Sequence, residues 1–193
     1  MASEVLNNQT KKLLITALKS IMEEKPLDKI TITAVVQKCN VSRRAFYYHF
    51  EDIYAATNWM LEEDLKKMQL LSTSEWTKSV SELLDYVQNN RKVCLCIALS
   101  SQHYRIEEMF YKQVYNNIME LLNSLNEDNH IDKKTVELIT HCYTVSIAAI
   151  ISNWLKNDID CSQKDLLNLF EKTMSDSCRV AINCCAQPFL ESQ

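Results

Sequence analysis

The stretch ITITAVVQKCNVSRRAFYYHFEDIY, residues 30–54, decides the fold of this chain of 193 residues. Its first part predicts a short helix, because apolar side chains recur there at the spacing of one helix face. Asn40 interrupts that pattern, and asparagine is the residue besides glycine that best adopts a left-handed backbone. Ser42 follows as a good N-cap for another helix. Two helices joined by so short a turn predict a helix-turn-helix.

The second of these helices has an outer face rich in arginine and tyrosine. Residues 41–50, VSRRAFYYHF, contain two arginines, two tyrosines, a histidine and two phenylalanines. Phe46 and Phe50 are four residues apart and are expected to share the buried side of the helix. The arginines and tyrosines fall mostly on the opposite side, where neither a core nor an ordinary solvated surface accounts for them. We therefore expect this face to contact another molecule.

The composition predicts an all-α protein. The chain has 47% hydrophobic and 24% charged residues, which is typical of a globular protein. It has no glycine and two prolines, so it lacks the turn residues that hairpins need. Besides the two helices above, the sequence predicts helices over residues 10–24, 52–71, 75–89, 91–100, 105–125, 132–157 and 163–184.

The sequence disfavours several classes of protein. The uncharged run 138–155 is as long as a membrane span, but its threonine, histidine, serine and asparagine side chains favour a buried helix. The N-terminal residues lack the apolar region of a secretory signal, which predicts a cytoplasmic protein with no membrane partner. The eight cysteines include no Cys-x-x-Cys pair, so we expect reduced thiols, no metal site and no cofactor. A glycine-rich phosphate loop and a catalytic constellation are both missing, so we expect no enzyme activity.

Charge is distributed unevenly along the chain, whose formal net charge is −4. Residues 1–60 hold eight lysines and arginines against six acidic residues, and residues 61–193 hold thirteen against nineteen. A mildly basic first part therefore precedes an acidic remainder, which is compatible with nucleic-acid binding by the first part.

The quoted stretch 30–54 resembles the helix-turn-helix of TetR-type bacterial transcription regulators. FYYHF with Trp59 after it, and SIAAIISNWLKNDIDCSQKDL at residues 146–166, are similar to the subgroup around dihydroxyacetone-kinase operon regulators. The resemblance implies a three-helix helix-turn-helix head over residues 1–50 that binds double-stranded DNA. It also implies a helical ligand-binding and dimerisation body over residues 51–193.

The resemblance further implies which residues contact DNA. Thr31 and Thr33 would contact DNA phosphates, and His49 would contact the DNA backbone. The arginines and tyrosines would face the major groove. Arginine can bind guanine O6 and N7 together, alanine can contact a thymine methyl group, and hydroxyls can donate to phosphate oxygens. Ile53 stands where the family often has lysine, so one phosphate contact is expected to be missing. The expected DNA contacts are Thr31, Thr33, Ser42, Arg43, Arg44, Ala45, Tyr47, Tyr48 and His49.

In the body, the resemblance places an effector pocket among the helices of residues 75–155. Apolar pockets with a few polar groups are the usual sites for small ligands. For Gln102, His103 and Tyr104 the alternative is a solvated loop, and His141 is expected to be a buried histidine with a partner. The expected pocket residues are Tyr86, Gln102, His103, Tyr104, Phe110 and Tyr143.

The last two long helices, 132–157 and 163–184, are the expected homodimer interface. Small side chains on the first of them permit close helix approach, and large apolar ones supply buried area. The alternative is that helix 132–157 is the central core helix of the monomer, because cores and interfaces use the same residue types. The expected interface residues are Ser146, Ala149, Ile150 and Trp154.

The leading hypothesis is a homodimeric, sequence-specific DNA-binding transcriptional regulator, a repressor, which binds a palindromic operator and responds to a small-molecule effector. One alternative is a DNA-binding coactivator that is controlled by a protein partner. Another is a helical interaction protein that no longer reads DNA, which the isoleucine at position 53 would favour.

Overall fold

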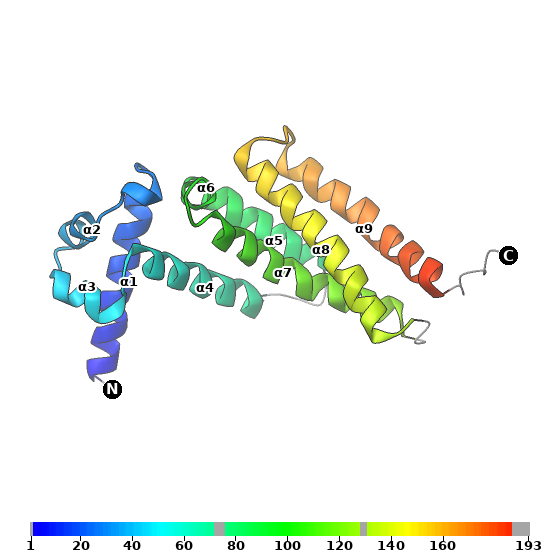
Figure 1. The fold of residues 1–193 in the computed structure, drawn as a ribbon, viewed down its shortest axis with the longest axis horizontal. Helices are drawn as coiled ribbons and strands as arrows, with labels where there is room; N and C mark the ends of the chain where they lie inside the picture. The colour runs from blue at the N-terminus through cyan, green and yellow to red at the C-terminus, as the bar shows by residue number, and fades with distance from the viewer. Residues whose placement is uncertain (1, 72–75, 128–130, 187–193) are drawn as a thin grey trace. The chain divides into compact units, whose positions relative to one another are not determined.

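The computed structural model describes residues 2–71, 76–127 and 131–186, and every regular element in these ranges is helical (Figure 1). This confirms the all-α prediction. The elements are α1 (Ala2–Met22), the 3-10 helix η1 (Leu27–Lys29), α2 (Ile32–Lys38), α3 (Arg43–His49), α4 (Ile53–Leu71), α5 (Trp76–Asn89), α6 (Arg91–Ala98), α7 (His103–Leu125), α8 (Lys133–Lys156) and α9 (Gln163–Ala186).

Most helix bounds agree with the sequence prediction to within two residues. The exception is the first helix, because α1 begins at Ala2 and not at residue 10. The helix-turn-helix appears as predicted, with α2 and α3 separated by a short turn. In that turn Asn40 has a left-handed backbone with φ of 53°, which confirms the role expected of it.

The chain folds into two compact units. The first contains Met1–Lys67 and Asn89–Met109, and the second contains Met68–Gln88 and Phe110–Gln193. The first unit therefore holds not only the expected head but also most of α4, the whole of α6 and the start of α7. The functional division at residue 50 stays a prediction.

The core of the first unit forms where α1 packs against α2, α3 and α6. Leu14 and Leu18 of α1 are almost completely buried, as are Val35 of α2 and Phe46 of α3. These side chains recur on one face of each amphipathic helix, so burying them fixes how α2 and α3 are held. The polar face of α3 is left outside the core.

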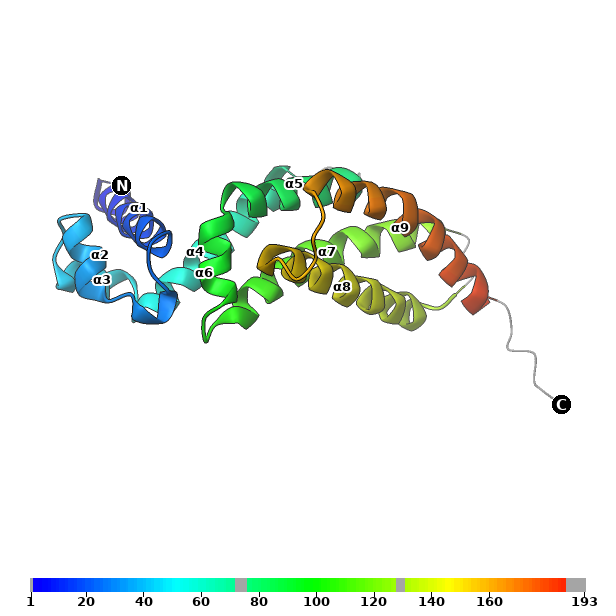
Figure 2. The same ribbon diagram turned by 90° about the horizontal axis from the view of Figure 1, so that it is seen from above.

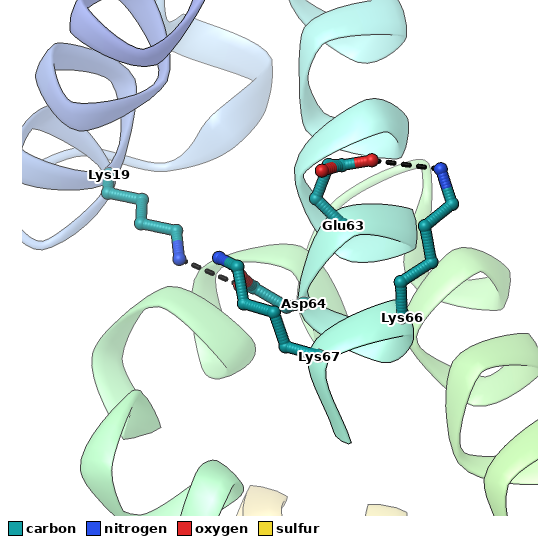
Figure 3. Close-up of polar contacts among 5 residues, drawn as sticks. All are labelled: Lys19, Glu63, Asp64, Lys66 and Lys67. Atoms are coloured by element: carbon teal, nitrogen blue, oxygen red, sulfur yellow. Dashed lines mark hydrogen bonds and ion pairs between the residues drawn. The ribbon is translucent and has the colours of Figure 1, made fainter. Parts of the chain in front are cut away.

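A buried carboxylate joins α4 to α1 within the first unit (Figure 3). Lys19 Nζ lies 2.7 Å from Asp64 Oδ2, and Lys67 Nζ lies 3.1 Å from Asp64 Oδ1. The Asp64 side chain is only 8% exposed, and a buried carboxylate is costly unless cations or hydrogen-bond donors surround it. The neighbouring pair of Lys66 and Glu63, 2.8 Å apart, is a more exposed pair within α4.

Asp28 of η1 connects three segments of the first unit. Its carboxylate accepts hydrogen bonds from the Ser101 amide at 3.1 Å and from the Ser101 hydroxyl at 2.9 Å. It also accepts one from the Tyr54 hydroxyl at 3.1 Å. The Ser101 amide and hydroxyl are the main reason that the pKa of Asp28 lies below its ordinary value. Nearby, the Cys96 thiol donates to the Lys25 carbonyl at 3.3 Å, so α6 and the loop after it are fixed to the end of α1 and to η1.

In the second unit α8 and α9 lie side by side, as both views show (Figures 1 and 2). Ile147, Ile151 and Leu155 of α8 are buried, together with Phe170 of α9. By length and composition alone α8 could cross a membrane, but one of its faces forms part of the core of this unit, and its exposed face carries both polar and apolar side chains. The prediction of a buried helix from the uncharged run is therefore confirmed for one face of α8.

His141 is a correction to the sequence prediction, because it is exposed and not buried. Its ring stacks on Tyr111 of α7 with centroids 6.0 Å apart and lies 5.2 Å from the Tyr115 ring. The Tyr111 hydroxyl is also hydrogen-bonded to His141 Nδ1. A largely apolar run does not show which face of its helix a single polar residue occupies. The sequence pattern therefore did not predict the cluster of His141 with Tyr111 and Tyr115.

Candidate nucleic-acid interface

The turn between α2 and α3 is closed by local hydrogen bonds. The Thr31 hydroxyl caps α2 by accepting from the Ala34 amide at 3.2 Å, and the Ser42 hydroxyl caps α3 by accepting from the Ala45 amide at 3.1 Å. These bonds satisfy amide groups that a helix end leaves without partners. The caps and the left-handed Asn40 together fix the direction in which α3 leaves the turn.

We expect Asn40→Ala to lower the free energy of unfolding by about 1 kcal/mol, because alanine is strained in the left-handed conformation. Asn40→Gly is the matched control, since glycine adopts this conformation without strain, and its stability should equal or exceed that of the wild type. Urea unfolding followed by circular dichroism measures both variants. Equal destabilisation by alanine and glycine would mean that the Asn40 side chain, and not its backbone, stabilises the turn.

The outer face of α3 is strongly exposed. Tyr47 is 52% exposed and Tyr48 is 76% exposed, and both arginines of the helix are exposed as well. Phe46 and Phe50 are buried, which confirms their predicted place in the core. All of the predicted DNA contacts lie in the first unit, at the start of α2 and along α3, with Ala45 and His49 half-buried at the edge of this face.

Arg43 connects α3 to α2. Its Nη1 donates to the Thr33 hydroxyl at 3.2 Å, and its Nη2 donates to the Tyr47 hydroxyl at 3.4 Å. In the part of the chain that the structure describes, the side chain of Arg44 makes no hydrogen bond or ion pair. The two neighbouring arginines are therefore in different environments, although the sequence presents them as equivalent.

Lys11 adds positive charge beside this face. Its Nζ lies 4.3 Å from the centroid of the Trp59 ring and 5.3 Å from that of Phe50, within the range of cation–π attraction. Burial lowers the pKa of His49, and the charge of Lys11 lowers it further, so both favour the neutral imidazole in the free protein. A ring N–H of His49 could donate to a phosphate in either protonation state. The sequence pattern did not single out Lys11, because this contact joins α1 to segments far along the chain.

Ile53 is 6% exposed and begins α4. Its side chain belongs to the core of the first unit, so it offers nothing to a phosphate. That one phosphate contact common in the resembled family is missing stays a prediction.

The expected pocket residues are divided between the two units. Gln102, His103 and Tyr104 lie in the first unit, where His103 begins α7 and the Tyr104 hydroxyl donates to Gln102 Oε1 at 2.8 Å. The other three lie in the second unit, with Phe110 completely buried and Tyr86 and Tyr143 half-buried. The structure therefore does not describe a common pocket for the whole set.

The expected interface residues also have different environments. Ser146 and Ala149 are exposed on α8, and Ile150 is half-buried. Trp154 is only 4% exposed, and its indole N–H donates to the Cys161 carbonyl at 3.0 Å. Because the monomer already buries Trp154, it has no surface to offer a partner, and we leave it out of the interface.

Burial disfavours the thiolate form of two cysteines. It raises the pKa of Cys94 to about 12 and that of Cys178 to about 11. Only the thiolate reacts readily with oxidants and electrophiles. These two side chains therefore pack in the core as small apolar groups.

An exposed row of arginines and tyrosines on a capped second helix defines a DNA-binding regulator of the helix-turn-helix class. Two family models match the chain: "Bacterial regulatory proteins, tetR family" over residues 14–55, and "Transcriptional regulator C-terminal region" over residues 74–176. The second match covers more than half of the chain. The chain belongs to the TetR family of bacterial transcription regulators and is not an enzyme.

Solved structures share the fold. The dihydroxyacetone kinase operon activator DhaS is 18% identical, with a TM-score of 0.68 over 91% of this chain and 97% of its own. RolR, solved without ligand, is 17% identical, with a TM-score of 0.56 over 92% of this chain and 97% of its own. No curated protein sequence matches this chain. At such low identities the structural likeness shows the fold alone.

Proposed function

We propose that this TetR-family protein is a cytoplasmic repressor that binds a palindromic operator as a homodimer and is released by a small-molecule effector. The observation that carries the DNA-binding part is the exposed face of α3, where two arginines and two tyrosines stand on a helix held by caps and by a buried phenylalanine. Arginine and hydroxyl donors at this position suit base edges and phosphates.

Footprinting the purified protein on the DNA that flanks its own gene tests this proposal. The expected result is a protected, palindromic segment whose binding weakens steeply as salt is raised. If no segment is protected even at low salt, the chain is a helical interaction protein that does not read DNA. Loss of transcription on adding the protein to a reporter system would support repression, and a gain would support activation.

Exposed apolar side chains on α8 and α9 support the homodimer. Leu138 and Val145 of α8 are both 57% exposed, and Leu169 and Val180 of α9 are 52% and 59% exposed. On α8, Leu138, Val145 and Ala149 recur at the spacing of one helix face, so they form a stripe, which we call the α8 stripe. A two-fold axis at the α8 stripe would join two copies of the chain in a symmetric dimer. Its two α3 helices could then bind the two half-sites of a palindrome.

Unpaired polar atoms inside the second unit support a small-molecule effector. Gln113 Oε1 on α7 and Thr144 Oγ1 on α8 are buried and have no hydrogen-bond partner among the described residues. Figures 1 and 2 show that α7 and α8 run in opposite directions. Their register follows from the contact of His141 with Tyr115 and from the distance of 3.7 Å between the Thr140 hydroxyl and the Met119 sulfur. This register brings Gln113 and Thr144 to a similar level along the two helices. Together they suit a small amphipathic molecule with a hydroxyl or amine group.

Thr144→Val tests whether the buried Thr144 hydroxyl lacks a hydrogen-bond partner in the absence of a ligand. We expect the free energy of unfolding to rise by about 1 kcal/mol without ligand, because valine removes a buried hydroxyl that lacks a partner. Thr140→Val is the matched control one turn away, since the Thr140 hydroxyl donates to the Val136 carbonyl at 2.9 Å, and it should lower stability by a similar amount. Thermal unfolding against a panel of small amphipathic compounds should also show a stabilising hit that Thr144→Val weakens. If Thr144→Val is as destabilising as Thr140→Val, the Thr144 hydroxyl is satisfied in solution and this support is lost.

A second candidate is a DNA-binding activator that is controlled by a protein partner. The observation in its favour is the ring cluster of half-buried Tyr111 and Tyr115 with exposed His141, since tyrosine is enriched at the centres of protein interfaces. The structurally similar DhaS is itself named an activator. Purified proteins encoded beside the gene can be tested for binding. A complex that Tyr115→Ala weakens would favour this candidate, and stabilisation by a small molecule alone would favour the first.

A further inference from the structure

We propose that the two neighbouring arginines of α3 have different roles on DNA. Arg43 is a positioning residue that orients the hydroxyls of Thr33 and Tyr47 as donors to phosphate, whereas Arg44 reads a base pair. This inference rests on the proposed DNA-binding function. It goes beyond that function because it assigns separate jobs to two residues that the sequence does not distinguish.

The hydrogen bonds of Arg43 determine what its two partners can do. A hydroxyl that accepts a hydrogen bond keeps its own proton for donation elsewhere. Thr33 and Tyr47 both accept from the guanidinium group, at 3.2 and 3.4 Å, so both are left with an O–H to donate outward. Phosphate oxygens only accept, and the positive charge beside the two hydroxyls favours an anion. The three side chains therefore form a donor cluster, drawn from α2 and α3, that suits one phosphate group.

Arg44 is suited to the other task. It follows Arg43 by one residue and so points about 100° further round the helix, and in the described residues the hydrogen bonds to the Thr33 and Tyr47 hydroxyls come from Arg43 and not from Arg44. Arg44 is exposed, and within the described residues no side chain or carbonyl holds its guanidinium group. Its planar set of donors is free to bind guanine O6 and N7 together, the commonest specific contact of arginine in the major groove. Both terminal nitrogens of Arg43 already have protein partners, so the protein and not a base sets the plane of that group.

The experiment measures dissociation constants of the full-length protein for an operator fragment selected from random DNA, and for every single-base-pair variant of it, over a range of salt. Arg44→Ala should weaken operator binding by about 5- to 150-fold and abolish discrimination at one base pair in each half-site. Arg44→Lys should also lose that discrimination, because lysine keeps the charge but not the bidentate geometry. Arg43→Ala should weaken binding to every DNA sequence by about the same factor, so that base discrimination is kept. It should also lower the number of counterions released on binding by about one per subunit.

A double-mutant cycle isolates the positioning role. Thr33→Val should cost about fivefold in the wild-type background and much less in the Arg43→Ala background, because the hydroxyl is then no longer oriented. All these residues are exposed, so circular dichroism should show an unchanged fold. Equal costs of Thr33→Val in both backgrounds would overturn the positioning role. Loss of base discrimination by Arg43→Ala, or its retention by Arg44→Ala, would overturn the division of roles. A wild-type protein that selects no DNA at all would refute the proposed function itself.

Discussion

Replacing Ala149 by glutamate is expected to give a folded, helical monomer that no longer binds its operator. Ala149 is exposed in the single chain, so glutamate there stays solvated and should change monomer stability by no more than about 0.5 kcal/mol. In a dimer that buries the α8 stripe, the same carboxylate would lose its water without gaining a partner. That costs about 3 kcal/mol or more, which weakens dimerisation by more than about 100-fold.

Analytical ultracentrifugation measures whether the protein is a monomer, circular dichroism whether it is folded and helical, and DNA titration whether it binds the operator. Asn116→Glu is the matched control, because it places the same charge at an exposed position of another helix, α7. The control should stay dimeric and bind DNA. An Ala149→Glu protein that remains dimeric would place the interface elsewhere, and one that unfolds would mean that Ala149 is part of the monomer core.

Phe46→Ala is expected to lower the free energy of unfolding by about 3–5 kcal/mol. Phe46 is fully buried, and its ring packs against those of Tyr47 and Phe50 at centroid distances of 6.0 and 5.8 Å. Removing the Phe46 ring leaves a cavity under α3. The expected loss is a large part of the total free energy of unfolding of most domains. DNA binding should fall with it, because α3 would lose the contact that sets its position.

Tyr48→Ala separates stability from recognition. Tyr48 is 76% exposed, so its loss should leave the unfolding transition almost unchanged while it weakens DNA binding. Urea unfolding and DNA titrations on the same preparations give both quantities. If Phe46→Ala and Tyr48→Ala had equal unfolding midpoints, the assignment of the two faces of α3 would be wrong.

Local chemistry explains which features could be predicted from the sequence. The conformation of Asn40 and the capping by Ser42 depend on residues within a few positions, so the turn was predictable. The spacing of Phe46 and Phe50 likewise identified the buried face of α3. Helix periodicity gave most element bounds for the same reason.

Features that depend on how distant segments pack could not be predicted. The bond between Arg43 and Thr33 requires the angle between α2 and α3, which no local pattern contains. Trp154 was assigned to an interface because a large apolar side chain on a long helix suits a core and an interface equally well. The exposure of His141 depends on the rotation of α8 about its axis, which the uncharged run 138–155 does not specify.

A chimaera that joins only residues 1–67 of this chain to another regulator would lack α6. Cys94 and Ile97 of that helix are fully buried, and α6 packs against α1, so its removal would uncover an apolar face of α1. Asp28 would also lose both hydrogen bonds from Ser101. The compact unit that carries α3 is discontinuous along the chain, and a graft that keeps its stability must transplant Asn89–Met109 together with Met1–Lys67.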